Sequence, residues 1–162
     1  MQGIKNITEL SNELTYHRYM LGQGQVQNLF QDIAIPEYIA LHRISHSINA
    51  KNDCTDRTYL KDIADELRLT VPKASKMVGS LRDKGLVSWS HDGNGSEGTY
   101  ITITDSGIRL MEKQEAFLKE YYSRVIEKFG QENMTNLLQL MVQLEAVMDD
   151  ELKSIGDGTD DL

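Results

Sequence analysis

The segment from residue 58 to residue 104 constrains the fold of this chain more than any other stretch. Its first ten residues place apolar side chains at the i, i+3, i+4 and i+7 spacing of one helical face. A turn of three residues, Arg68 to Thr70, follows, and a second helical face begins after it. The apolar residues of the two faces are Leu60, Ile63, Ala64 and Leu67, and then Ala74, Met77, Val78 and Leu81.

The second of these two helices has clear boundaries in the sequence. Thr70 is a favourable N-cap residue, and Pro72 falls in the first turn, where a missing N–H costs nothing. Gly85 is the glycine that commonly stands just after the end of a helix. These three residues fix where the helix begins and ends.

Two short strands are expected after this helix, over Leu86–Ser90 and Thr99–Ile103, joined by the turn-rich residues 92–98. The order of helix, short turn, helix and hairpin predicts a winged helix-turn-helix. A helix pair followed by a β-hairpin, with no role in DNA binding, has the same order and stays open as an alternative.

The outward positions of the second helix favour the DNA-binding interpretation. They are small, polar or basic, as a helix that enters a major groove requires. We expect Lys76 to contact a guanine edge, Lys73 a phosphate or a base, and Ser75 either. Pro72 and Ala74 offer apolar contacts to a thymine methyl group. The full set of expected DNA-binding residues is Arg57, Thr70, Pro72, Lys73, Ala74, Ser75, Lys76, Ser80, His91 and Asn94.

The sequence resembles the MarR family of transcription regulators at three places. Leu67–Val87 is similar to the family's helix-turn-helix core, and Thr104–Gly107 resembles the Thr-x-x-Gly that opens the long helix after the wing. Residues 35–41 resemble the start of the helix that precedes the helix-turn-helix. The resemblance covers nearly all of residues 4–155 and implies a homodimer that binds palindromic double-stranded DNA, more often as a repressor.

The wing departs from the family pattern. The family usually carries an Asp-x-Arg-Arg-type stretch there, with an arginine for the minor groove. Residues 92–98 of this chain contain no Lys or Arg. We therefore expect phosphate or backbone contacts at most from the wing, with His91 and Asn94 as its best polar candidates.

Helices are expected on both sides of residues 58–104, and the winged unit as a whole spans residues 35–104. Residues 4–30 are expected to form a first amphipathic helix, with a bend at Gly22 and Gly24, and residues 35–48 the next helix. After residue 105 the chain is helical again, and Gly130 divides it. Apolar residues in steps of three and four follow, as in a helix–helix seam: Met134, Leu137, Met141, Leu144, Met148 and Leu152.

One winged unit is too small to bury both terminal regions, which indicates a shared dimer interface. We therefore expect an N-terminal dimerisation helix within 1–34, C-terminal dimerisation helices within 105–155 and a disordered acidic tail over 156–162. The fold class is mainly α, with a small β-hairpin wing.

The charge distribution reconciles DNA binding with a formal net charge of −8. Residues 57–91 hold seven Lys/Arg and four Asp/Glu, a local charge of +3, whereas residues 104–162 hold six and thirteen, a local charge of −7. Charges farther apart than about 8–10 Å are largely screened at moderate salt. A single cysteine, Cys54, fits a reducing compartment, and no stretch has the pattern of a membrane span or signal peptide, so we expect a cytoplasmic protein.

The resemblance also implies a site for a small aromatic or lipophilic effector between the winged unit and the dimer helices. The residues expected to line it are Tyr16, His17, Met20, His42 and His46. His42 and His46 also have a metal-ligand spacing, but two histidines alone rarely make a site, and we predict neither metal nor cofactor. No catalytic motif is present, so we expect no enzyme, and a protein-interaction or anti-repressor module is the alternative function.

Overall fold

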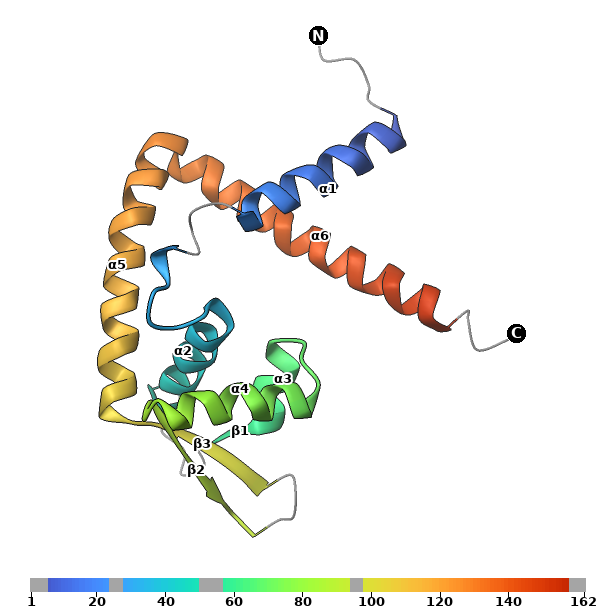
Figure 1. Ribbon diagram of the computed structural model, residues 1–162. Coiled ribbons are helices and arrows are strands. Elements are labelled where there is room, and N and C mark those ends of the chain that lie inside the picture. The colour runs from blue at the N-terminus through green and yellow to red at the C-terminus, as the bar shows by residue number, and fades with distance from the viewer. Residues whose placement is uncertain (1–5, 24–27, 50–56, 94–97, 158–162) are drawn as a thin grey trace. The chain divides into compact units, whose positions relative to one another are not determined.

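The computed structural model describes residues 6–23, 28–49, 57–93 and 98–157, and the chain divides into two compact units, Met1–Phe117 and Leu118–Leu162. Figure 1 shows the helices and strands, which in chain order are α1 (Ile7–Gln23), α2 (Ile35–Asn49), β1 (Thr58–Tyr59), α3 (Leu60–Glu66), α4 (Val71–Asp83), β2 (Val87–His91), β3 (Thr99–Ile103), α5 (Asp105–Phe129) and α6 (Gln131–Asp157). The boundary between the two units falls within α5. The predicted fold class, mainly helical with a small β wing, is confirmed.

The sheet has three antiparallel strands in the order β1-β3-β2. The hairpin of β2 and β3 was predicted, and its register pairs Val87 with Ile103 and His91 with Thr99. The short strand β1 was not predicted, and it pairs Thr58 with Ile101 on the other edge of β3. The wing is therefore joined directly to the segment that begins α3.

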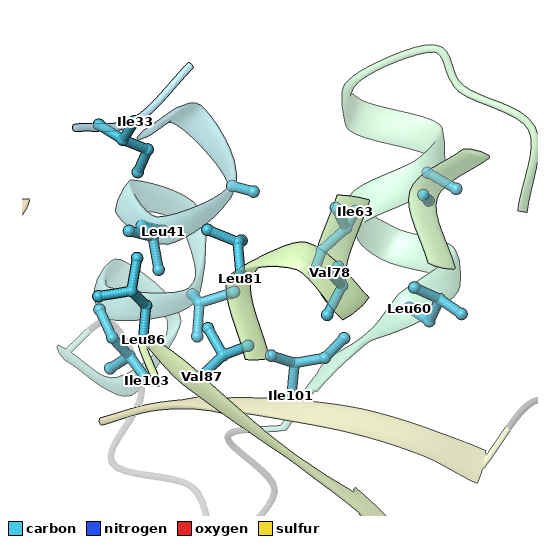
Figure 2. Close-up of a cluster of buried hydrophobic side chains, with 14 residues drawn as sticks. Ile33, Leu41, Leu60, Ile63, Val78, Leu81, Leu86, Val87, Ile101 and Ile103 are labelled. Carbon is cyan, nitrogen blue, oxygen red and sulfur yellow. The ribbon is translucent and has the colours of Figure 1, made fainter. Parts of the chain in front are cut away.

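A single hydrophobic core holds α2, α3 and α4 on one face of this sheet. Figure 2 shows side chains of the three helices meeting Val87, Ile101 and Ile103 from the strands. Burying a Leu, Ile or Val side chain of this kind stabilises a fold by about 1.5–3 kcal/mol. The largest side chains with almost no exposed surface are Leu41, Ile44, Ile63, Val78 and Leu81.

The Thr-x-x-Gly motif fixes the start of α5 against the end of α4. The hydroxyl of Thr104 donates to the carbonyl oxygen of Gly85 over 2.7 Å and accepts from the N–H of Gly107 over 3.1 Å. A Cβ atom at position 107 would collide with the carbonyl oxygen of Leu86. Glycine is therefore required at position 107 for close backbone approach, and the threonine caps the helix.

The first helix is shorter than the sequence pattern indicated. It begins after Asn6, whose side-chain oxygen accepts from the N–H of Glu9, while Glu9 accepts from the N–H of Asn6 in return. It ends at Gln23 instead of continuing to residue 30. Gly22, which has a low helix propensity, lies in the last turn of α1. The predicted helix over 35–48 is confirmed.

The second unit contains the end of α5 and the whole of α6, separated by Gly130 with φ of 99°. The helix α6 reaches Asp157, so it extends into the predicted tail, whose remaining residues lie outside the described part. Large apolar side chains of α6 are exposed in the isolated chain. Those exposed by 40% or more are Leu137, Leu138, Leu140, Met141, Val142, Leu144, Val147, Leu152 and Ile155.

The helix α1 also exposes its apolar side chains. Its described residues include none that is buried, and Ile7, Leu10 and Leu14 are 85%, 52% and 46% exposed. Among the described helices, none is long and apolar enough to cross a membrane.

Candidate nucleic-acid interface

The helix α4 is anchored by one face and exposes the other. Ala74, Val78 and Leu81 have no exposed surface, whereas Lys73 and Lys76 are exposed. The hydroxyl of Thr70 accepts from the N–H of Lys73 over 3.4 Å, and Pro72 lies in the first turn, as predicted. The first two turns of α4 therefore present two cations from a backbone that the core holds in place.

Two residues expected on the DNA-facing side have other roles. Ala74 is fully buried in the core, so its methyl group is not available to a thymine, which corrects that expectation. Ser80 is half-buried, and its hydroxyl donates to Oε1 of Glu37 over 3.1 Å. Ser80, one turn after Lys76, therefore faces α2 and not the exposed side of α4. Ser75 is half-exposed and is the remaining expected hydroxyl near the two lysines.

The carboxylate of Glu37 links the start of α2 to the end of α4. Its Oε2 atom accepts from the N–H of Ala34 over 3.0 Å and from Nζ of Lys84 over 2.9 Å. Burial acts to raise the pKa of Glu37. Hydrogen bonds from Ala34, Lys84 and Ser80, with the charge of Lys84, outweigh burial and hold the pKa below its ordinary value.

Sequence reasoning missed this cluster. The one available signal was a glutamate in the first turn of a helix, which is the position of the acid in a capping box. Its partners on α4 are 43 and 47 residues away in the chain. Their approach depends on how α2 and α4 pack.

The strand β3 of the wing carries a cation held on an aromatic ring, near the hairpin loop. The guanidinium carbon of Arg57 lies 4.3 Å from the centroid of the Tyr100 ring, on β3. Tyr59 contacts the same ring edge-on, and its hydroxyl donates to the carboxylate of Asp92 over 3.0 Å. Arg57 is therefore presented beside the wing in a fixed position, as a cation stacked on an aromatic face.

His91 and Asn94 are the two polar residues expected to contact DNA from the wing. Nδ1 of His91 accepts from the N–H of Gly93 over 2.9 Å, so one ring nitrogen is engaged in the turn. Asn94 lies outside the described residues. The ring of Trp89, on β2, lies 5.0 Å from the guanidinium of Arg82, at the last turn of α4.

The five expected effector-site residues form two separate groups. Tyr16 and His17 contact each other edge-on at 5.2 Å between ring centroids. His42 and His46 are stacked at 3.9 Å, and His42 also lies 6.0 Å from the ring of Tyr38. Among the described residues, no contact between aromatic rings joins Tyr16 and His17 to His42 and His46.

A shallow depression lies elsewhere, between α2 and α3. It contains none of the five effector candidates; its lining is Ile39, Ala40, Arg43, Ile63, Glu66 and Leu67. Within the described residues, no group of three or more His, Cys, Asp or Glu side chains could hold a metal ion.

Solved structures share this arrangement, although no protein-family model and no curated protein sequence match the chain. NMB1585, a MarR family regulator from Neisseria meningitidis, is 15% identical over 93% of this chain and 99% of its own, with a TM-score of 0.64.

Two further structures match over similar lengths. MepR from Staphylococcus aureus, in a complex with DNA, is 17% identical over 88% of this chain and 96% of its own, with a TM-score of 0.61. PcaV from Streptomyces coelicolor, in complex with its natural ligand, is 13% identical over 90% and 98%, with a TM-score of 0.64. The chain therefore has the fold of the MarR family regulators.

Proposed function

We propose that this protein is a transcription regulator that binds double-stranded DNA as a homodimer. The observation that carries the proposal is the exposed face of α4, where Lys73 and Lys76 project from a helix whose opposite face is fully buried. A matching fold, that of MepR, occurs in a complex with DNA. A helix of this kind enters the major groove through its N-terminal residues.

Some of the proposed contacts position the protein on the DNA backbone, and others read the base sequence. Lys76 binds a guanine edge, Lys73 a phosphate or a base, and Ser75 either, while Pro72 meets a thymine methyl group. Thr70 serves mainly by capping α4, where its hydroxyl already accepts a backbone N–H. Arg57, stacked on Tyr100, reaches a phosphate beside the wing in place of an arginine at the wing tip.

The exposed apolar faces of α1 and α6 support a homodimer. A second copy of the chain would cover the side chains of Leu10, Leu14, Leu144 and Leu152, which the isolated chain leaves 52%, 46%, 41% and 64% exposed. Large apolar side chains exposed along a helix face, as on each of these two helices, mark an interaction surface. A two-fold axis would place two α4 helices on a palindromic site, with half-site centres about 10 base pairs apart.

The finer proposal is a repressor released by a small effector. The dimer occupies an operator and blocks polymerase, and an effector changes the separation of the two α4 helices. A small aromatic or lipophilic molecule would bind near Tyr16, His17 and Met20 on α1 and near the stacked pair His42 and His46 on α2. A matching structure, PcaV, holds its natural ligand, and MepR has been solved bound to ethidium bromide.

A titration of the full chain with random-sequence duplex DNA tests the proposal. Binding should weaken steeply between about 50 and 200 mM salt, because neutralised phosphates release counterions. Selection of duplexes from a random pool should then yield a palindrome. The net charge of −8 and a wing without Lys or Arg favour the alternative, a protein-interaction module, for which no steep salt dependence is expected.

A further inference from the structure

The helix α4 ends in a Schellman motif with glycine in the left-handed position. The N–H of Gly85 donates to the carbonyl oxygen of Arg82 over 2.8 Å, and the N–H of Leu86 donates to that of Leu81 over 3.0 Å. Gly85 has φ of 75°. Glycine is the residue expected here, because it has no Cβ to clash in the left-handed region.

The helix α3 ends in the same motif, with Arg68 in the position that Gly85 holds after α4. The N–H of Arg68 donates to the carbonyl oxygen of Asp65 over 3.2 Å, and the N–H of Leu69 donates to that of Ala64 over 2.8 Å. Leu69 packs against the core, which is the apolar contact that accompanies this motif. Position 68 therefore needs the same left-handed backbone conformation that Gly85 adopts after α4.

Position 68 nevertheless holds an arginine. Its φ is 53°, and among the described residues it is the only non-glycine residue with a positive φ. A residue with a Cβ is strained in this conformation, and such strain concentrates at functional sites. The chain uses glycine for the same turn at Gly85, so the reason for an arginine at 68 lies in its side chain.

We infer that the guanidinium of Arg68 binds a DNA phosphate at the edge of the groove that α4 enters. This inference rests on the proposed DNA-binding function. In a helix-turn-helix the first helix crosses the DNA backbone while the second enters the groove, so the turn between them faces the backbone. Arg68 is exposed in that turn, two residues before the N-cap of α4. Arginine suits this role because its planar fork of donors matches phosphate oxygens.

Three variants of the full chain separate the charge of Arg68 from its backbone strain. Arg68→Gly removes both, Arg68→Ala removes the charge and keeps the strain, and Arg68→Lys keeps both. Each is titrated with the random-sequence duplex over a salt range and melted in the absence of DNA at one protein concentration. The wild-type chain is measured first, because its salt-dependent binding establishes the underlying function independently.

The DNA titration should separate the variants by the charge at position 68. Arg68→Ala and Arg68→Gly should each weaken binding about tenfold, which corresponds to loss of one charge-assisted hydrogen bond. Both should lower the salt slope by about one per bound subunit, and Arg68→Lys should keep the wild-type slope, because the charge remains. The melting temperatures in the absence of DNA should show that all three variants fold, so that their affinities can be compared.

Two results would overturn the inference while leaving the proposed function standing. One is wild-type affinity and salt slope in Arg68→Gly. The other is a salt slope of Arg68→Lys lowered as far as that of Arg68→Ala, which would show that the charge at position 68 does not contact a phosphate. A wild-type chain that binds duplex DNA without salt dependence would instead remove the proposed function itself.

Discussion

Removing the carboxylate of Glu37 should destabilise the winged unit far more than removing an ordinary surface acid. Glu37→Ala breaks the hydrogen bonds to Ala34, Ser80 and Lys84, which are 2.9–3.2 Å long, at a side chain that is only 10% exposed. The backbone bond acts as a helix cap and contributes about 1 kcal/mol. The bonds to the half-buried hydroxyl of Ser80 and to the partly exposed Lys84 add to this. We therefore expect the free energy of unfolding to fall by about 2–3 kcal/mol in total.

Denaturant unfolding at a fixed protein concentration measures this loss, because oligomerisation changes apparent stability. For a chain of this length the melting temperature should fall by about 5–10 °C. Glu66→Ala is the matched control. Its carboxylate pairs with Arg43 over 2.8 Å, but both side chains are about half exposed, so its loss should cost under about 1 kcal/mol. Equal costs for the two variants would refute the reasoning.

The carboxylate of Glu37 also makes the stability of the fold depend on pH. The pKa of Glu37 in the fold lies below its ordinary value of 4.5, so the ionised form is favoured in the folded state. Its contribution to stability is therefore present above about pH 4.5 and is lost as the pH falls through the folded-state pKa. The stability difference between wild type and Glu37→Gln should be constant from about pH 7 to pH 5 and shrink below that.

Two further predictions concern close packing and assembly. Gly107→Ala places a Cβ against the carbonyl oxygen of Leu86 and should cost about 2 kcal/mol or more. Gly79→Ala, in open space within α4, should instead raise stability by about 0.5–1 kcal/mol; the same sign for both in thermal melts would contradict the packing. Changing Leu144 and Met148 together to Asp should dissociate a dimer in sedimentation, because burying unpaired charge costs several kcal/mol; a wild-type chain that sediments as a folded monomer would contradict the proposed interface.

Local patterns in the sequence predicted the winged unit well because its elements carry their own boundaries. Thr70 and Pro72 mark the start of α4, and Gly85 marks its end, through backbone chemistry that needs no distant partner. The strand β1 has no such signal. Two residues, Thr58 and Tyr59, form a strand only because β3 lies beside them, so their state depends on tertiary pairing.

The DNA-facing side of α4 could be predicted only in part. Helical spacing shows which side of a helix is polar, but it does not show which residues at the border of that side are buried. Lys73 and Lys76 are exposed as expected, but Ala74 is buried and Ser80 turns to Glu37. Only the packing of α2 against α4 decides the environment of that last turn. The strained turn at Arg68 was also invisible, because an arginine in a sequence carries no sign of its φ angle.

The reading of DNA by α4 is the central claim, and paired titrations of Lys73→Ala and Lys76→Ala test it most directly. Each variant is titrated with a duplex selected by the wild-type chain and with a scrambled duplex of the same length. Lys76→Ala should lose about 1–3 kcal/mol per half-site on the selected duplex and relax sequence choice at one position. Lys73→Ala should weaken binding to both duplexes alike and lower the salt slope by about one per site. If the double variant, folded and dimeric, binds both duplexes as tightly as the wild type, α4 does not read DNA.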